Sequence, residues 1–209
     1  MKKGLEGYYR LHACIYDMTR WSFLFGREAI IDLLAKRCSP AHILEVGCGT
    51  GKNLVQLAGK FPGAEITGLD LSPEMLKQAV KKCRPFTGRI HLIQKSYDGP
   101  IQPGTFDIVL FSYSLSMMES EWRTAVESAA IDLVRHGRIA VADFHNTPVS
   151  TFRSWMQLNH VRMQGHLLPG LSHFFTSEYS RIRAGYAGIW NYLIFLGRPK
   201  NQSAPRVNQ

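Results

Sequence analysis

The chain has 209 residues, 45% of them hydrophobic, and a formal net charge of +9. This length and apolar content are sufficient for one α/β domain with a buried core, which excludes a disordered chain. No apolar run approaches the ~20 residues that a membrane-spanning helix needs. The four cysteines, Cys14, Cys38, Cys48 and Cys83, form no C-x-x-C pair, so reduced thiols are expected rather than a metal site.

The excess positive charge lies in the two flanks of the sequence. Residues 41–143 carry eleven basic and eleven acidic residues, whereas residues 1–40 carry seven and four. Residues 144–209 carry seven basic residues and a single acid, Glu178. Positive flanks favour an acidic partner, such as nucleic acid, an acidic substrate or an anionic membrane. Lys2 and Lys3 precede no long apolar stretch, so no signal peptide is expected.

The predicted elements alternate between helix and strand. Residues 5–37 have the spacing of two helices, with an unusually aromatic segment at 15–27. The strands that follow are predicted at 43–46, 65–69, 90–94, 107–112 and 137–143. The helices are predicted at 53–60, 73–83, 121–134 and 150–163. A loop is predicted around 168–170 and a terminal antiparallel strand pair within 182–197, so the pattern indicates a mainly parallel sheet with helices on both faces.

Glycines at alternate positions follow the first of these strands. Gly47, Gly49 and Gly51 allow positive φ and close approach of a ligand to the backbone. The free N–H groups at the start of the next helix attract a polar ligand. A dinucleotide-binding fingerprint needs its third glycine at position 52, which is Lys52. Because the carboxylate of Glu45 would repel a pyrophosphate, a ligand with a cationic amino-acid end fits better.

A second carboxylate ends the next predicted strand. Asp70 lies about 20 residues after the glycines, where the ribose hydroxyls of a nucleotide are commonly bound. Ser72 and Pro73 then suit the N-cap and first position of a helix. Since ligands bind beyond the carboxyl ends of parallel strands, Ser96 and Ser112 are further candidates at the ends of later strands.

Together these residues resemble motif I and the following acidic position of the class I methyltransferases, which bind S-adenosyl-L-methionine (AdoMet). The resemblance implies a three-layer αβα, Rossmann-like fold with a mostly parallel seven-stranded sheet. It also implies AdoMet as cofactor, with S-adenosyl-L-homocysteine as product. The cofactor-binding residues implied are Glu45, Gly47, Cys48, Gly49, Gly51, Asn53, Asp70, Leu71, Ser96, Tyr97 and Ser112.

One adenine contact departs from this family's pattern. Family members often place an Asp after the third strand to accept from the adenine amino group. This chain has Ser96 near that point, and Asp98 is displaced. The Ser96 hydroxyl and the Tyr97 backbone are the expected substitutes.

The flanks are similar to bacterial betaine-lipid N-methyltransferases, which convert diacylglyceryl-homoserine to diacylglyceryl-trimethylhomoserine by three methylations. Residues 9–12, 15–17 and 19–27 carry the amino-terminal part of this resemblance, and residues 185–192 carry the aromatic ending. The ending is also similar to that of phosphatidylethanolamine N-methyltransferases. The resemblance therefore implies a lipid amine as methyl acceptor.

It also implies roles for residues outside the core motifs. Aromatic rings stabilise the cationic ammonium, and arginine binds the head-group carboxylate. Tyr16 is expected to act at the reacting amine and His145 to take the released proton. A capped or solvent-facing His145 is an open alternative. The expected substrate-binding residues are Trp21 and Tyr113, together with the candidate arginines Arg20, Arg153, Arg181 and Arg183, among which the sequence does not choose.

One methyltransferase domain is expected over residues 1–209. Residues 1–38 would form a helical lid over the acceptor, 41–145 the cofactor-binding core and 146–209 the acceptor side. A cytoplasmic enzyme is expected, bound peripherally to the anionic inner face of the membrane through its positive flanks.

Three other hypotheses compete with this one. A nucleic-acid methyltransferase is disfavoured because no Asn/Asp-Pro-Pro-aromatic tetrad follows the fourth strand. A non-catalytic AdoMet-binding protein is disfavoured because Glu45, the three glycines and Asp70 are intact. A phosphatidylethanolamine or small-molecule N-methyltransferase is the nearest alternative.

Overall fold

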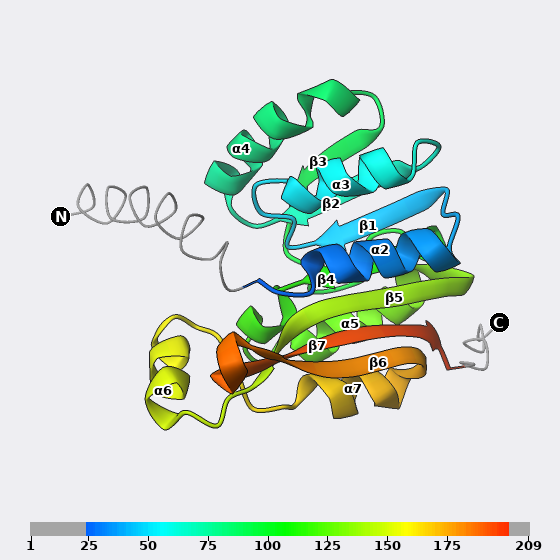
Figure 1. The fold of residues 1–209 in the computed structure, drawn as a ribbon. Helices are drawn as coiled ribbons and strands as arrows, with labels where there is room; N and C mark the ends of the chain where they lie inside the picture. Colours follow the sequence, from blue (N-terminus) through cyan, green and yellow to red (C-terminus); the bar gives the residue numbers. More distant parts are fainter. Residues whose placement is uncertain (1–23, 201–209) are drawn as a thin grey trace.

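A single seven-stranded sheet runs through the computed structural model, which describes residues 24–200 (Figure 1). The strand order is β3-β2-β1-β4-β5-β7-β6. The strands are β1 (His42–Val46), β2 (Glu65–Asp70), β3 (Ile90–Gln94), β4 (Phe106–Ser112), β5 (Leu133–Asn146), β6 (Phe175–Gly185) and β7 (Trp190–Pro199). Strands β1 to β5 pair in parallel, and β7 is antiparallel to both β5 and β6. The predicted α/β sheet with a terminal antiparallel pair is confirmed.

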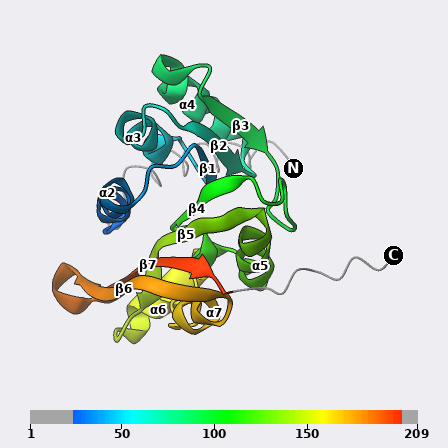
Figure 2. The same cartoon turned by 90° about the vertical axis from the view of Figure 1, so that its right-hand side faces the viewer.

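Helices cover both faces of this sheet (Figure 2). In the described chain they are α2 (Arg27–Arg37), α3 (Lys52–Lys60), α4 (Pro73–Cys83), α5 (Trp122–Asp132), α6 (Ser150–Leu158) and α7 (Leu167–Phe174). The apolar side chains of α2, α3 and α4 share one buried cluster with the sheet, and those of α5 and α7 share another. The result is the expected three-layer αβα arrangement.

The sheet order creates a crevice at the carboxyl end of β1. β1 lies between β2 and β4. The chain therefore first builds the sheet from β1 toward the β3 edge, and then crosses back to β4 and builds it toward the β6 edge. Connections that leave neighbouring strands toward opposite faces open a crevice between them, and this is where open α/β sheets bind ligands. The glycine turn that follows β1 and the segment that follows β4 therefore face each other.

The loop predicted around 168–170 is wrong, because Leu167–Phe174 form α7. Pro169 lies in the first turn of this helix, where a missing N–H removes no intrahelical bond. Gly170 faces Trp122 of α5, and an added Cβ would lie 2.3 Å from the indole ring. Both residues are commonly loop signals. Here Pro169 is compatible with the first turn of a helix, and Gly170 allows that helix to pack closely against α5.

Other element boundaries also differ from the prediction. Helix α6 ends at Leu158 rather than 163, and His160 nearby adopts a left-handed φ of 59°. Helix α5 ends at Asp132, two residues early, where the carboxylate accepts hydrogen bonds from the backbone amides of Ile101 and Gln102. β5 is longer than its predicted range of 137–143, because Leu133 pairs with Phe106 of β4 and Asn146 pairs with Asn191 of β7. The terminal hairpin is longer than 182–197, because β6 and β7 stay paired from one end of β7 to the other.

The structure also bears on the expectations for the cysteines, for metal ions and for membrane-spanning helices. Cys38, Cys48 and Cys83 are free thiols, whereas Cys14 and the first predicted helix lie outside residues 24–200. No group of side chains within that range is arranged to hold a metal ion. None of the helices found there is both long enough and apolar enough to cross a membrane.

Candidate functional site

The turn after β1 is shaped by glycines in left-handed conformations. Gly47 has a φ of 75°, and a Cβ added there would lie 2.6 Å from the Cβ of Ser114, which follows β4. Gly49 has a φ of 54°, but no described atom lies within 4 Å of its added Cβ. The turn is therefore packed tightly against the β4 segment at Gly47 and open at Gly49.

The Asp70 carboxylate ties the end of β2 to this turn. Its Oδ2 accepts a hydrogen bond from the backbone N–H of Gly49 at 2.7 Å, and its Oδ1 accepts one from the N–H of Ser72 at 2.9 Å. A carboxylate oxygen has a second lone pair, so both oxygens can still accept from a ligand. Asp70 thus fixes the turn and presents acceptors beside it.

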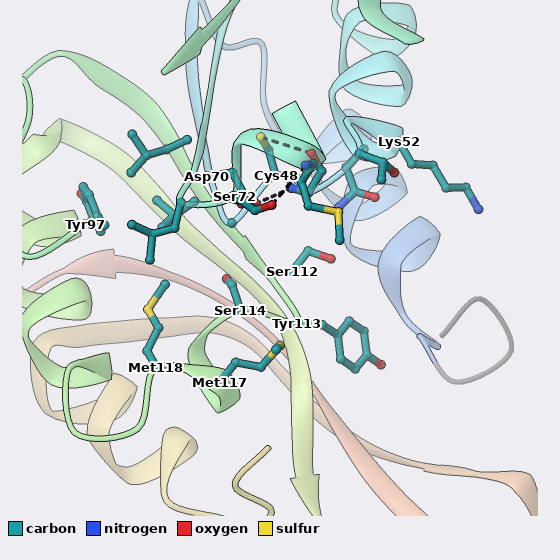
Figure 3. Close-up of a pocket in the computed structure, with 18 of the residues that line it drawn as sticks. Cys48, Lys52, Asp70, Ser72, Tyr97, Ser112, Tyr113, Ser114, Met117 and Met118 are labelled. Atoms are coloured by element: carbon teal, nitrogen blue, oxygen red, sulfur yellow. Dashed lines mark hydrogen bonds between the residues drawn. The ribbon is translucent and has the colours of Figure 1, made fainter. Parts of the chain in front are cut away.

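A cavity of about 370 Å³ opens between this turn and the segment after β4. Figure 3 shows Cys48 and Asp70 on one side, with Ser112, Tyr113 and Met117 across from them. Its volume lies within the range of small-molecule sites, and apolar walls with a few polar groups are typical of them. The Ser112 and Ser114 hydroxyls are buried without a hydrogen-bond partner among the described residues. Unpaired hydroxyls at a cavity wall are available to a polar ligand.

Tyr113 forms the far wall in a strained conformation. Its φ of 57° is uncommon for a residue with a side chain. The phenol packs edge-on against Phe144 at 4.7 Å between ring centroids, and its hydroxyl donates to the backbone carbonyl of Phe25. Such strain persists only where the surroundings hold it, and it is concentrated at functional sites. Tyr113 therefore links the cavity wall to the segment that precedes α2.

Behind the turn lies a buried polar pair. Asn53 Nδ2 donates to Glu45 Oε1 at 2.7 Å, and both residues are almost fully buried. The other carboxyl oxygen of Glu45 has no partner among the described residues. Burial raises the pKa of Glu45 to about 8, although the bond from Asn53 and the charge of Arg27 act in the opposite direction. The carboxyl group is therefore protonated at neutral pH.

Comparison with known proteins identifies this arrangement. The family model of a methyltransferase domain matches residues 43–137, which include the glycine turn, Asp70 and β4. The solved structure of the N-methyltransferase NodS from Bradyrhizobium japonicum WM9, in complex with S-adenosyl-L-homocysteine, aligns with a TM-score of 0.70 at 18% identity. The alignment covers 84% of this chain and 86% of that one. The match places a methyltransferase domain within residues 43–137, and the fold of the chain is that of the aligned N-methyltransferase structure.

The sequence relatives of this chain carry different activities in their names. The chain is 31% identical over 134 residues to the ubiquinone/menaquinone biosynthesis C-methyltransferase UbiE of Syntrophotalea carbinolica. It is 34% identical over 103 residues to a malonyl-[acyl-carrier protein] O-methyltransferase of Geobacter sulfurreducens. These matches cover 62% and 49% of this chain, but only 56% and 37% of the two relatives.

The residues of this cavity fit AdoMet. The open space at Gly49 allows a ligand to approach the backbone, and the Asp70 carboxylate can accept from ribose hydroxyls. The unpartnered hydroxyls of Ser112 and Ser114 can pair with the polar groups of the amino-acid end.

Most of the predicted cofactor residues line the cavity: Gly47, Cys48, Gly49, Asn53, Asp70, Leu71, Ser96, Tyr97 and Ser112. Glu45 does not, because it lies behind the turn, where it binds Asn53. Gly51 does not either, because it packs against α4, where an added Cβ would lie 2.9 Å from Cys83 Sγ. The Tyr97 hydroxyl donates to Asp132 at 2.8 Å, which leaves only its backbone and ring edge for a ligand.

Fewer of the predicted substrate-binding residues line the cavity. Tyr113 lines the cavity, whereas Arg153, Arg181 and Arg183 do not. Arg153 donates to the carbonyl of Thr147 at 2.6 Å. Arg181 and Arg183 are exposed on β6, at the edge of the sheet. Their role in acceptor binding stays a prediction, as does that of Tyr16, Arg20 and Trp21, which lie outside the described residues.

His145 also lies away from the cavity lining. Its backbone carbonyl accepts from the N–H of Gly165 at 2.7 Å, and its half-buried ring has an Nδ1 without a partner among the described residues. Burial lowers the pKa of this imidazole, which favours its neutral form. A neutral imidazole can accept a proton, but none of the cavity-lining residues is a histidine.

Sequence reasoning missed part of the lining. Leu24, Arg27 and Glu121 line the cavity although none was a candidate. Arg27 begins α2 and Glu121 is the residue before α5, so both reach the site through tertiary packing. No local motif marks Arg27. Glu121 belongs to no motif either, but it is an acidic residue in the segment that follows β4, and that position is a signal in the sequence.

Replacing Asp70 by alanine is expected to weaken AdoMet binding by about 1–3 kcal/mol, the scale of hydrogen bonds to a charged group. Isothermal titration calorimetry measures this directly. Asp107→Ala is the matched control, because Asp107 also accepts two backbone N–H groups, from Ala41 and His42, but does so away from the cavity. Equal AdoMet affinity in wild type and Asp70→Ala would show that Asp70 does not bind the ribose.

The buried Glu45 predicts a pH dependence of folding. Between about pH 4.5 and 8 the folded state keeps a proton that the unfolded state has released, so the free energy of unfolding falls as pH rises, by up to about 1.4 kcal/mol per pH unit. Glu45→Gln should flatten this slope, and the exposed Glu127→Gln should not. Urea unfolding at several pH values tests it; the same slope in wild type and Glu45→Gln would contradict a protonated Glu45.

Proposed function

We propose that this chain is an AdoMet-dependent N-methyltransferase acting on the amine of a lipid head group. The proposed acceptor is diacylglyceryl-homoserine and the product diacylglyceryl-trimethylhomoserine. Methyl transfer is supported by the cavity in which the glycine turn and Asp70 face Tyr113 and the unpartnered Ser112 and Ser114 hydroxyls. The lipid amine is supported by the resemblance of the flanks and by the apolar wall of Leu24, Met117 and Met118.

When bound, AdoMet supplies an electrophilic methyl group on a sulfonium. The chain's own contribution is positioning, which can account for much of the rate of a two-reactant displacement. Asp70 and the Gly49 turn would hold one reactant, and the wall formed by Tyr113 would direct the other toward it. The amine must arrive neutral, and its proton can leave to solvent or to the carboxylate of Glu121, which lines the cavity.

The ring of Tyr113 adds an electrostatic effect. An aromatic face stabilises an ammonium by roughly 0.5–2 kcal/mol, depending on how far it is desolvated. Tyr113 is only 2% exposed, and its ring is held by Phe144 and by the hydrogen bond to Phe25. Positive charge that develops on the amine during transfer would therefore be stabilised by an aromatic ring that is held in place and shielded from water.

The alternative acceptors are phosphatidylethanolamine and a small-molecule amine, which need the same chemistry. Transfer of labelled methyl from AdoMet separates them, with diacylglyceryl-homoserine, phosphatidylethanolamine and small amines offered in parallel. A demethylated quinol and a carboxylic acid belong in the panel, because the named relatives are C- and O-methyltransferases. Label in the homoserine lipid is expected. Label confined to a non-amine acceptor would overturn the proposal.

A further inference from the structure

Aromatic rings form a continuous row beside the cavity. On α6, the rings of Phe152 and Trp155 lie 5.7 Å apart between centroids. Phe152 stacks on Trp190 at 5.4 Å, Trp190 contacts Tyr186 at 5.0 Å, and Tyr186 meets Phe25 edge-on at 5.2 Å. These five residues, the aromatic strip, join α6, the β6–β7 turn and the segment before α2. Figure 1 places α6 and that turn at the same end of the molecule, on the left.

The outer members of the aromatic strip face solvent. Trp155 is 52% exposed and Tyr186 45%, and Leu158 beside Trp155 on α6 is 80% exposed. Val149, Phe25 and Ile189 are exposed as well. The rings are linked through Trp190, which is itself only 1% exposed, so the solvent-facing members of the strip are Trp155, Tyr186 and Phe25. Single exposed apolar residues are ordinary, but several gathered on one part of the surface mark an interaction site.

The charge around the aromatic strip is positive. In the β6–β7 ladder Arg183 is paired with Tyr192, so the two side chains lie on the same face of the sheet. The Tyr192 ring stacks with Phe25 at 6.0 Å, which brings this face to the strip. Arg181 lies two residues earlier on the same face, with its guanidinium over the Tyr179 ring at 5.3 Å, and the exposed Arg153 follows Phe152 in the sequence of α6. The surface therefore combines apolar rings with guanidinium groups.

Acidic residues are almost absent from this part of the chain. Between residues 144 and 200 the sequence has one acid, Glu178. It lies near the start of β6, away from the turn, and is bonded to Arg138 at 2.7 Å and to Arg198. An anionic partner would therefore meet no acid of this segment near the β6–β7 turn.

We propose that the aromatic strip, with Leu158 and the arginines 153, 181 and 183, docks on an anionic lipid bilayer. Tryptophan and tyrosine favour the membrane–water interface, and each nearby arginine adds attraction to anionic lipid. The strip adjoins the cavity at Phe25, whose backbone carbonyl accepts a hydrogen bond from the Tyr113 hydroxyl. Tyr113 and Leu24, the residue before Phe25, both line the cavity. The inference deepens the proposed function and rests on it in one respect: docking there would bring lipid head groups to the cavity mouth.

Sedimentation of the full chain with vesicles tests the docking surface. Vesicles of phosphatidylcholine mixed with phosphatidylglycerol are expected to bind the chain, more weakly as salt rises, and pure phosphatidylcholine to bind it poorly. The double variant Trp155→Ser, Leu158→Ser should lose about tenfold or more in vesicle affinity. Arg181→Glu, Arg183→Glu should lose about as much. Val80→Ser and Lys81→Glu on α4, equally exposed, are the matched controls.

Three results would overturn this docking surface. They are vesicle binding equal in wild type and the Trp155/Leu158 variant, equal binding to neutral and anionic vesicles, and self-association of the chain that the same variant abolishes. An unchanged AdoMet affinity in that variant shows that it is folded. Methyl transfer to detergent-dispersed lipid needs no bilayer and should be retained in it. Failure of transfer in wild type, with vesicle binding intact, would reject the proposed function and leave the docking surface standing.

Discussion

A valine in place of Gly49 is expected to abolish measurable AdoMet binding. Gly49 has a φ of 54°, and a β-branched residue in this left-handed region is strained by about 1–3 kcal/mol. A Cβ added at Gly49 would have no described atom within 4 Å, because Gly49 faces the cavity. The added atoms would occupy the space that the ligand needs, so the steric effect adds to the strain. A loss of more than about a hundredfold is expected.

Gly104→Val separates the two causes of this loss. Gly104 has a similar φ of 63° and equally open surroundings, but it lies outside the cavity. It should lose comparable stability in urea unfolding and keep its affinity for AdoMet in calorimetry. Gly49→Ala is expected to fall between the valine variant and wild type. If Gly49→Val is folded and binds AdoMet normally, the cavity beside the turn is not the cofactor site.

The parts of the site that the sequence predicts are the ones built by local chain geometry. A strand, a glycine turn and a helix start follow one another directly, so Gly47, Gly49 and Asn53 arrive at one place with few alternatives. Asp70 is predictable for the same reason, because β2 pairs with β1 and ends beside the turn. Parallel pairing of two adjacent strands fixes both positions.

Residues brought to the site by distant packing are not predictable in this way. Arg27 and Leu24 reach the cavity because α2 packs on the α3 side of the sheet. The left-handed φ of Tyr113 depends on Phe144 and Phe25, which are far from it in the sequence. No propensity or spacing at Tyr113 carries that information.

Similar reasoning explains why α7 was missed. Pro169 and Gly170 are loop signals when read locally, and both are tolerated in the helix because of where they fall. Pro169 is in the first turn, and Gly170 lies where the Trp122 ring of α5 leaves no room for a side chain. The fit between α5 and α7 decides the helix, and it is a property of two segments together.

The predicted catalytic role of Tyr16 can be tested although this residue lies outside the described range. The described chain begins at Leu24, and this residue lines the cavity. Tyr16→Ala is expected nearly to abolish methyl transfer, because it removes both the hydroxyl and the aromatic face that would stabilise the ammonium. Tyr16→Phe keeps the face and should lower turnover only moderately.

Both Tyr16 variants should bind AdoMet nearly as wild type does, because the residues expected to hold it are the Gly49 turn and Asp70. Calorimetry and lipid methylation must therefore be measured on the same protein. Tyr179→Ala is the matched control, because this tyrosine lies on β6, outside the residues that line the cavity. A parallel loss of cofactor affinity and turnover would assign Tyr16 to folding. Full turnover in Tyr16→Ala would mean that this ring is not at the reacting amine, and the lipid acceptor would lose one of its supports.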